Sequence, residues 1–123
     1  MTPRPGPAEL LAYARKATGA GDSSRWGRSW ERSAVFLTRT ALESTVANRW
    51  TGSLADMRWA PMSTQLICLP CYLDPDLAHR VHAAWAQLST ACHAHPYELP
   101  PTIAELHRWI DTVDQLIAAP TEA

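Results

Sequence analysis

A chain of 123 residues is the length of a single domain and is long enough to bury a hydrophobic core without disulfide or metal support. A formal net charge of −1 excludes binding of nucleic acid through bulk basic charge, although it leaves a local basic face open. The hydrophobic content of 46% is ordinary for a globular domain, and no apolar run reaches the roughly 20 residues of a membrane-spanning helix.

The cysteine content favours one cellular compartment. Three cysteines form an odd number, and the sequence shows no signal-peptide pattern, so we expect reduced thiols in the cytoplasm rather than a disulfide framework. Six tryptophans stand against one phenylalanine. Rings of this size fill a helical core, or they line a pocket or a partner surface.

The first helix is predicted between two stretches that disfavour regular structure. Residues 1–7 are rich in proline and are expected to form a flexible tail, with Pro7 suited to the first turn of a helix. Leucine and alanine then recur at helical spacing over residues 8–17. The Gly-Ala-Gly sequence that begins at Gly19 is expected to end this helix.

No proline interrupts the stretch 22–51, which we predict to be the central helix. At about 100° per residue it shows two apolar stripes rather than one. A helix that is apolar on two sides is surrounded by other helices. The first stripe contains Trp26, Trp30, Ala34, Leu37 and Ala41, and the second contains Val35, Leu42, Val46 and Trp50, with Phe36 at its edge.

Arg39 and Glu43 point into the second of these stripes. Their i,i+4 spacing allows them to form an ion pair, and charges in an apolar surface are costly unless they are paired. The pair is either structural, at the rim of the bundle, or a polar group placed at a shared cleft. Arginines also concentrate over residues 25–49, which indicates either a local phosphate-binding face or an ordinary solvated helix face.

The second half of the chain predicts three more helices. Residues 54–60 are expected to form a linker or a single turn, and residues 61–69 a short helix that Pro70 breaks. Asp74 as cap and Pro75 in the first turn begin a helix that runs to about Ala94.

The last helix has the clearest pattern in the chain. Thr102 and Glu105 have the spacing of a capping box, and residues 120–123 are expected to fray. Together these elements predict an all-α, four- to five-helix up-and-down antiparallel bundle, with residues 8–119 as a single domain. The apolar stripe of the last helix contains Ile103, Leu106, Trp109, Ile110, Val113, Leu116 and Ile117.

The segment Cys-His-Ala-His-Pro-Tyr at residues 92–97 follows a helix end, where polar backbone groups are available to ligands. If the helical phase persists, His95 turns toward the apolar face of the preceding helix and His93 points elsewhere. A histidine facing a bundle interior is either a satisfied core residue or a general acid–base group.

A zinc site is the competing interpretation. Cys68 and Cys71 have the two-residue gap of a zinc pair, and His79 and His82 could complete four ligands. The three-residue separation of the two histidines on one helix, with His79 near the solvent side, weighs against this site, as does the core position expected for Cys68. We therefore predict no metal and no cofactor.

Several sequence segments resemble segments of the HEPN domains of prokaryotes. They are Ala-Val-Phe-Leu-Thr-Arg-Thr-Ala-Leu-Glu at 34–43, Gln-Leu-Ile-Cys-Leu-Pro at 65–70 and Ala-Cys-His-Ala-His-Pro-Tyr-Glu-Leu at 91–99. Residues 101–116 are similar to actinobacterial members in particular. The resemblance implies a helical bundle that acts as a homodimer and binds or cleaves RNA without metal, in a toxin–antitoxin or defence system.

The catalytic signature of that family is an arginine, four to six residues of any kind, and then a histidine. His95 matches the histidine, but residues 88–90, which occupy the arginine position, are leucine, serine and threonine. Arg39, Arg49 or an arginine of a second subunit would have to supply the charge, so the resemblance implies either a metal-independent ribonuclease or a degenerate member that binds RNA. The candidate catalytic residues are His95, Arg39 and Glu43, and the candidate substrate-binding residues are His93, Arg49 and Tyr97.

Two other functions remain open. A non-catalytic module could bind a protein partner, and an exposed face formed by Trp26 and Trp30 would favour this function. A small-molecule pocket could instead form around Trp59, Trp85 and residues 93–97. RNA binding that weakens with salt would distinguish the first function from both alternatives.

Overall fold

A computed structural model describes residues 3–19, 30–93 and 99–120, and within these ranges it contains helices and no strand. The all-α prediction is therefore confirmed. The elements are α1 (Pro7–Gly19), α2 (Trp30–Asn48), the 3-10 helix η2 (Gly52–Trp59), α3 (Met62–Cys68), the 3-10 helix η3 (Leu69–Cys71), α4 (Pro75–Cys92) and α5 (Ile103–Ala118). None of the helices in the described ranges combines the length and apolarity needed to cross a membrane.

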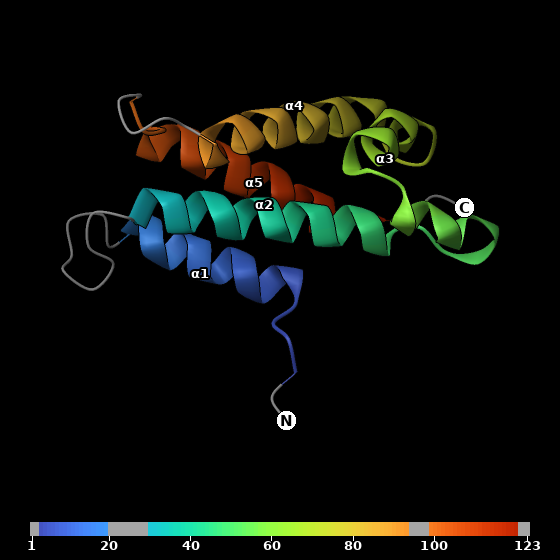
Figure 1. Cartoon of the computed structure of the whole chain (residues 1–123), viewed down its shortest axis with the longest axis horizontal. Helices are drawn as coiled ribbons and strands as arrows, with labels where there is room; N and C mark the ends of the chain where they lie inside the picture. Colours follow the sequence, from blue (N-terminus) through green and yellow to red (C-terminus); the bar gives the residue numbers. More distant parts are fainter. Residues whose placement is uncertain (1–2, 20–29, 94–98, 121–123) are drawn as a thin grey trace.

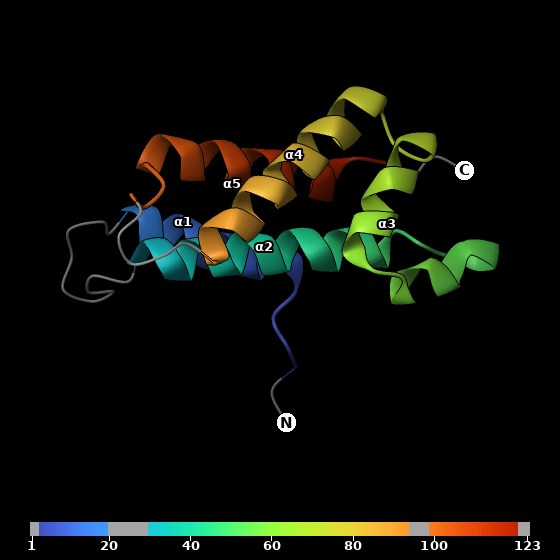
Figure 2. The ribbon, with the colours of Figure 1, turned by 45° about the horizontal axis from the view of Figure 1, so that its top comes forward.

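The four long helices alternate in direction along the long axis of the molecule, as predicted for an up-and-down bundle (Figure 1). Both α2 and α5 pack on α1 and on α4, and they also pack on each other. Helix α4 crosses α2 at an angle, and the short helix α3 lies near the C-terminal end of α2 (Figure 2). The predicted central position of α2 is thus confirmed, and α5 shares it.

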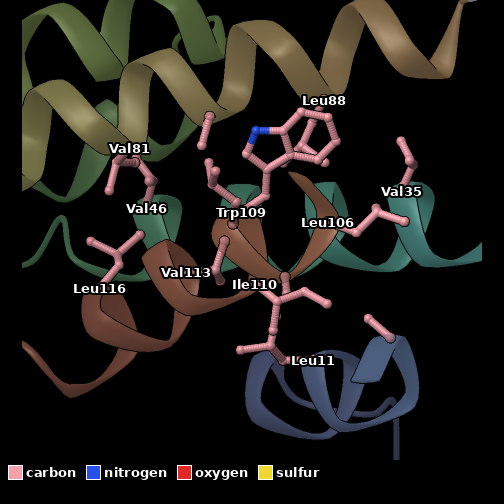
Figure 3. Close-up of a cluster of buried hydrophobic side chains, with 14 of the residues drawn as sticks. Leu11, Val35, Val46, Val81, Leu88, Leu106, Trp109, Ile110, Val113 and Leu116 are labelled. Carbon is pink, nitrogen blue, oxygen red and sulfur yellow. The ribbon is translucent and has the colours of Figure 1, made fainter. Parts of the chain in front are cut away.

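The core is built from the predicted apolar stripes. On α2, residues of both stripes are buried, and α5 contributes four side chains that are fully buried (Figure 3). Trp26 lies outside the described residues. The buried stripe residues of α2 with the neighbouring Trp50 are Trp30, Ala34, Val35, Ala41, Leu42, Val46 and Trp50, and those of α5 are Leu106, Trp109, Ile110, Val113 and Leu116.

The predicted helix starts of α4 and α5 are also confirmed. Asp74 caps α4 by accepting a hydrogen bond from the backbone N–H of Leu77 at 3.1 Å, and Pro75 occupies the first turn. Thr102 and Glu105 form the reciprocal hydrogen bonds of a capping box at the start of α5. These signals are local in sequence, so a single chain segment is enough to specify them.

The region after α2 differs from the prediction. Helix α2 ends at Asn48 rather than near residue 51, and residues 52–59 form a 3-10 helix where a linker or single turn is predicted. The backbone turns at Gly52, which has a φ of +62° that glycine tolerates. Trp50 thereby leaves the helix and buries its ring, which meets the ring of Tyr72 edge-on at a centroid distance of 5.6 Å.

Gln65, a buried residue of α3, fixes this arrangement. Its Oε1 accepts a hydrogen bond from the indole Nε1 of Trp50 at 2.9 Å. Its Nε2 donates to the carbonyl oxygens of Ala60 at 2.8 Å and Arg58 at 3.2 Å. The side-chain amide of Gln65 therefore accepts the hydrogen bond of a buried indole and links η2 to α3.

The Gln65→Leu substitution tests this role. It removes an acceptor and two donors from a buried site, so we expect the free energy of unfolding to fall by about 2–3 kcal/mol. The matched control is Gln115→Leu, since Gln115 pairs with Arg80 on the exposed surface and its loss should change stability by less than about 0.5 kcal/mol. Urea denaturation measures both variants, and equal losses would contradict the assigned role.

Candidate functional site between α2 and α4

A polar cluster lies between α2 and α4, centred on the carboxylate of Glu43. Nη2 of Arg39, one turn earlier on α2, lies 3.6 Å from Glu43 Oε2. The same oxygen accepts a hydrogen bond from the indole Nε1 of Trp85 on α4 at 3.0 Å. The side chains of Arg39 and Glu43 are 28% and 33% exposed. The predicted ion pair is confirmed, and Trp85 joins it to a second helix.

Two side-chain polar atoms, one of them in this cluster, are buried without a hydrogen-bond partner among the described residues. They are Nε of Arg39 and Oγ of Ser89. Ser89 follows Trp85 by one helical turn, so both side chains project from the same side of α4. Because a buried polar atom without a partner costs roughly 1–3 kcal/mol, such atoms indicate a place that can accept a water molecule or a ligand group.

The outer face of α2 continues from this cluster toward the N-terminus of the helix. Arg32, Phe36 and Arg39 are separated by four and three residues, so they lie on one side of α2. Arg32 is exposed, and Phe36 is 62% exposed. Phe36, which the sequence analysis places at the edge of the second apolar stripe, is therefore largely exposed, and no helix of the described residues covers this side of α2 at that level.

The C-terminal end of α4 provides one described histidine. The backbone N–H of His93 donates to the carbonyls of Thr90 and Ala91, which closes the helix at Cys92, and the side chain of His93 is exposed. His93 lies two turns beyond Trp85, or about 12 Å along the helix axis. His95 and Tyr97 lie outside the described residues, so neither is placed relative to the cluster.

Arg49, a predicted substrate-binding residue, contacts the C-terminal end of α5. Its guanidinium donates to the carbonyl oxygens of Leu116 at 3.3 Å, Ala119 at 3.2 Å and Pro120 at 2.8 Å. Partial burial lowers the pKa of Arg49 from its ordinary value. The positive charge complements the C-terminal end of the α5 dipole, so Arg49 caps α5 and is not brought together with Arg39 or His93.

The residues considered for zinc remain apart. Cys68 and Cys71 are free thiols at the end of α3 and in η3, whereas His79 and His82 lie on α4. In the described part of the chain, no three side chains of histidine, cysteine, aspartate or glutamate gather where they could hold a metal ion.

Of the aromatic residues proposed as pocket walls, Trp59 and Trp85 lie on different elements, and Tyr97 lies outside the described residues. Trp59 is 81% exposed at the end of η2, which packs on α2, whereas Trp85 is half-buried beside Glu43. The ring of His82 lies 6.4 Å from that of Trp85 and is tilted by 54°. Trp30 is buried, so it does not contribute to an exposed tryptophan face.

The sequence analysis missed the partnership of Trp85 with Glu43, because it considers Trp85 only as a wall of a small-molecule pocket. A signal was present. The indole N–H of a partly buried tryptophan needs an acceptor, and Glu43 is a carboxylate on the apolar side of the central helix. Predicting this hydrogen bond requires knowing where α4 crosses α2, and that position cannot be read from the sequence.

The searches of protein-family models, curated proteins and solved structures each returned no match to this chain.

Two substitutions at Glu43 separate its charge from its hydrogen bond. Glu43→Gln keeps an acceptor for Trp85 and removes a partly exposed ion pair, so we expect stability to fall by less than about 1 kcal/mol. Glu43→Leu also removes the acceptor and should cost roughly 1–3 kcal/mol. Urea denaturation gives the free energies, and the NMR shift of the Trp85 indole N–H reports the bond. An indole shift that is unchanged in Glu43→Leu would contradict the assignment.

Proposed function

We propose that this chain is a HEPN-like protein that binds single-stranded RNA on the outer face of α2, which we define as Arg32, Phe36 and Arg39. The observation that carries the proposal is the exposed phenylalanine between two arginines on one helix side. Proteins that bind single-stranded nucleic acid combine aromatic side chains, on which bases stack, with basic groups that contact the phosphates.

The charge distribution supports an attraction for RNA by one surface of the protein rather than by its overall charge. The net charge of −1 provides no general attraction for RNA, so affinity must come from particular side chains. Arg32 is available to a phosphate, while Arg39 is held in place by Glu43 and keeps an unpartnered Nε. The outer face of α2 therefore offers one exposed and one positioned guanidinium beside a stacking platform.

Cleavage would require a proton-transfer group near this face. In the proposal His95 acts as the general acid–base group, and Arg39 stabilises charge on the phosphate in place of the missing motif arginine. Glu43 then positions Arg39 and does not touch the substrate. In the same proposal, His93 and Tyr97 contact the RNA. The protein acts as a homodimer in the cytoplasm, within a toxin–antitoxin or defence system, and it has a cognate protein partner.

RNA binding is tested with a fluorescein-labelled single-stranded 12-mer by anisotropy at several salt concentrations. We expect Phe36→Ala to weaken binding by about fivefold or more, since stacking contributes roughly 1–3 kcal/mol per base. Arg32→Ala should weaken binding and reduce the salt slope by about one. Tyr13→Ala is the matched control, because Tyr13 is an exposed aromatic residue of α1 that lies apart from this face.

The binding proposal fails if the wild-type protein shows no saturable binding, or if Phe36→Ala and Tyr13→Ala have the same effect. Association of the chain with itself that is insensitive to salt, without RNA binding, would instead support a protein-interaction module. The exposed side chains of Trp59 and Ile67, at 81% and 69%, favour that second candidate, since large exposed apolar groups occur at interfaces.

Cleavage is tested separately on single-stranded RNA in the presence of a chelator. We expect the wild-type protein to cleave slowly and His95→Ala to lose the activity by about 100-fold or more, the usual contribution of a general acid–base group. Gel electrophoresis of end-labelled RNA measures the products. Equal cleavage by both proteins, or none by either, would remove His95 from catalysis and leave the binding proposal standing.

A further inference from the structure

A cavity of about 510 Å³, which opens widely to solvent, lies between the second half of α4 and the start of α5. Its size falls in the range of about 300–1,000 Å³ that is usual for small-molecule sites. Alanines of α4, Pro100, Pro101 and Trp109 form an apolar lining. The cavity lies on the side of α4 that faces α5 and uses none of the residues of the outer face of α2.

Trp109 is a fixed wall of this cavity. Its ring reaches from α5 toward α4 and is only 6% exposed (Figure 3). The indole Nε1 donates to Oε1 of Gln87 on α4 at a short distance of 2.6 Å. The ring is therefore held by both helices, so a ligand would meet a surface that is already organised.

Glu105 is the one ionisable residue among the described residues that line the cavity. Its Oε1 accepts from the backbone N–H of Thr102 at 3.1 Å and from Thr102 Oγ1 at 3.2 Å. No ion pair is formed by Glu105 with any described residue. The capping box thus anchors a carboxylate at the cavity, and no cationic side chain in the described part of the chain pairs with its charge.

We propose that this cavity binds a small organic cation with a flat apolar body, of the arylalkylammonium class. The apolar body would lie against Trp109 and the two prolines, and the ammonium would lie at the Glu105 carboxylate. The positive end of the α5 dipole, equivalent to roughly half a charge, reduces the attraction of the carboxylate but does not cancel it.

The charge of the cavity can be tested with three probes of the same shape. Benzylamine is cationic at neutral pH, benzyl alcohol is neutral and benzoate is anionic. NMR titration of the ¹⁵N-labelled protein follows the indole N–H of Trp109 and gives the affinity of each probe. We expect benzylamine to bind tightest, benzyl alcohol more weakly and benzoate not measurably.

Glu105→Gln is the decisive variant, because glutamine preserves the capping box while removing the charge. We expect it to weaken benzylamine binding by about fivefold, the effect of losing about 1 kcal/mol, and to leave benzyl alcohol binding unchanged. Ala86→Leu, at an exposed position of α4 that lines the cavity, should weaken both probes by filling the space. An unchanged urea midpoint shows that each variant is folded.

Three outcomes would overturn the proposal. They are the absence of benzylamine binding to the wild-type protein, equal affinity for benzylamine and benzoate, and unchanged benzylamine affinity in Glu105→Gln. None of these outcomes affects RNA binding by the outer face of α2, because the two sites share no residue. Loss of RNA binding with retained benzylamine binding would likewise reject only the RNA proposal.

Discussion

Among the described residues, three indole N–H groups link separate elements of this bundle, and each donates to a side-chain oxygen on a helix that does not carry the tryptophan. A buried indole packs as a large apolar group, but its N–H needs an acceptor, so each pair constrains which helices can be neighbours and in which register. Apolar burial alone is not directional in this way. The pairs are Trp50 with Gln65, Trp85 with Glu43 and Trp109 with Gln87, at 2.9, 3.0 and 2.6 Å.

These acceptors explain where the polar groups of the bundle gather. Helix α2 is apolar on two sides and packs on α1, α4 and α5, so Arg39 and Glu43 lie at the edge of a buried surface. Each charge there needs a partner, and Glu43 serves both Arg39 and Trp85. On the other side of α4, Gln87 holds Trp109 against the cavity at the start of α5. Helix α4 therefore separates two chemically different surfaces.

The parts of the fold that could be predicted from sequence are those that depend on nearby residues. Helical periodicity identified the buried face of α5 apart from Ile103, which is 43% exposed, and the capping box at Thr102 identified where the helix begins. The 3-10 helix after α2 could not be predicted, because it depends on Gln65 reaching Trp50 from another helix. The site was predicted in part for the same reason. The pair of Arg39 and Glu43 is local, whereas the contribution of Trp85 and the exposure of Phe36 follow from how α4 crosses α2.

The same constraint determines which residues can report on function. Glu43 and Gln87 each accept a hydrogen bond that joins two helices, so a loss of binding after their removal would combine an effect on the site with an effect on the fold. Phe36 and Arg32 are exposed, and substitutions there change the surface while leaving the helix contacts in place. The Glu105→Gln substitution has the same advantage, since it keeps the cap and removes only the charge. In a bundle held by side-chain hydrogen bonds between helices, functional claims are therefore best tested at positions that carry none of those bonds.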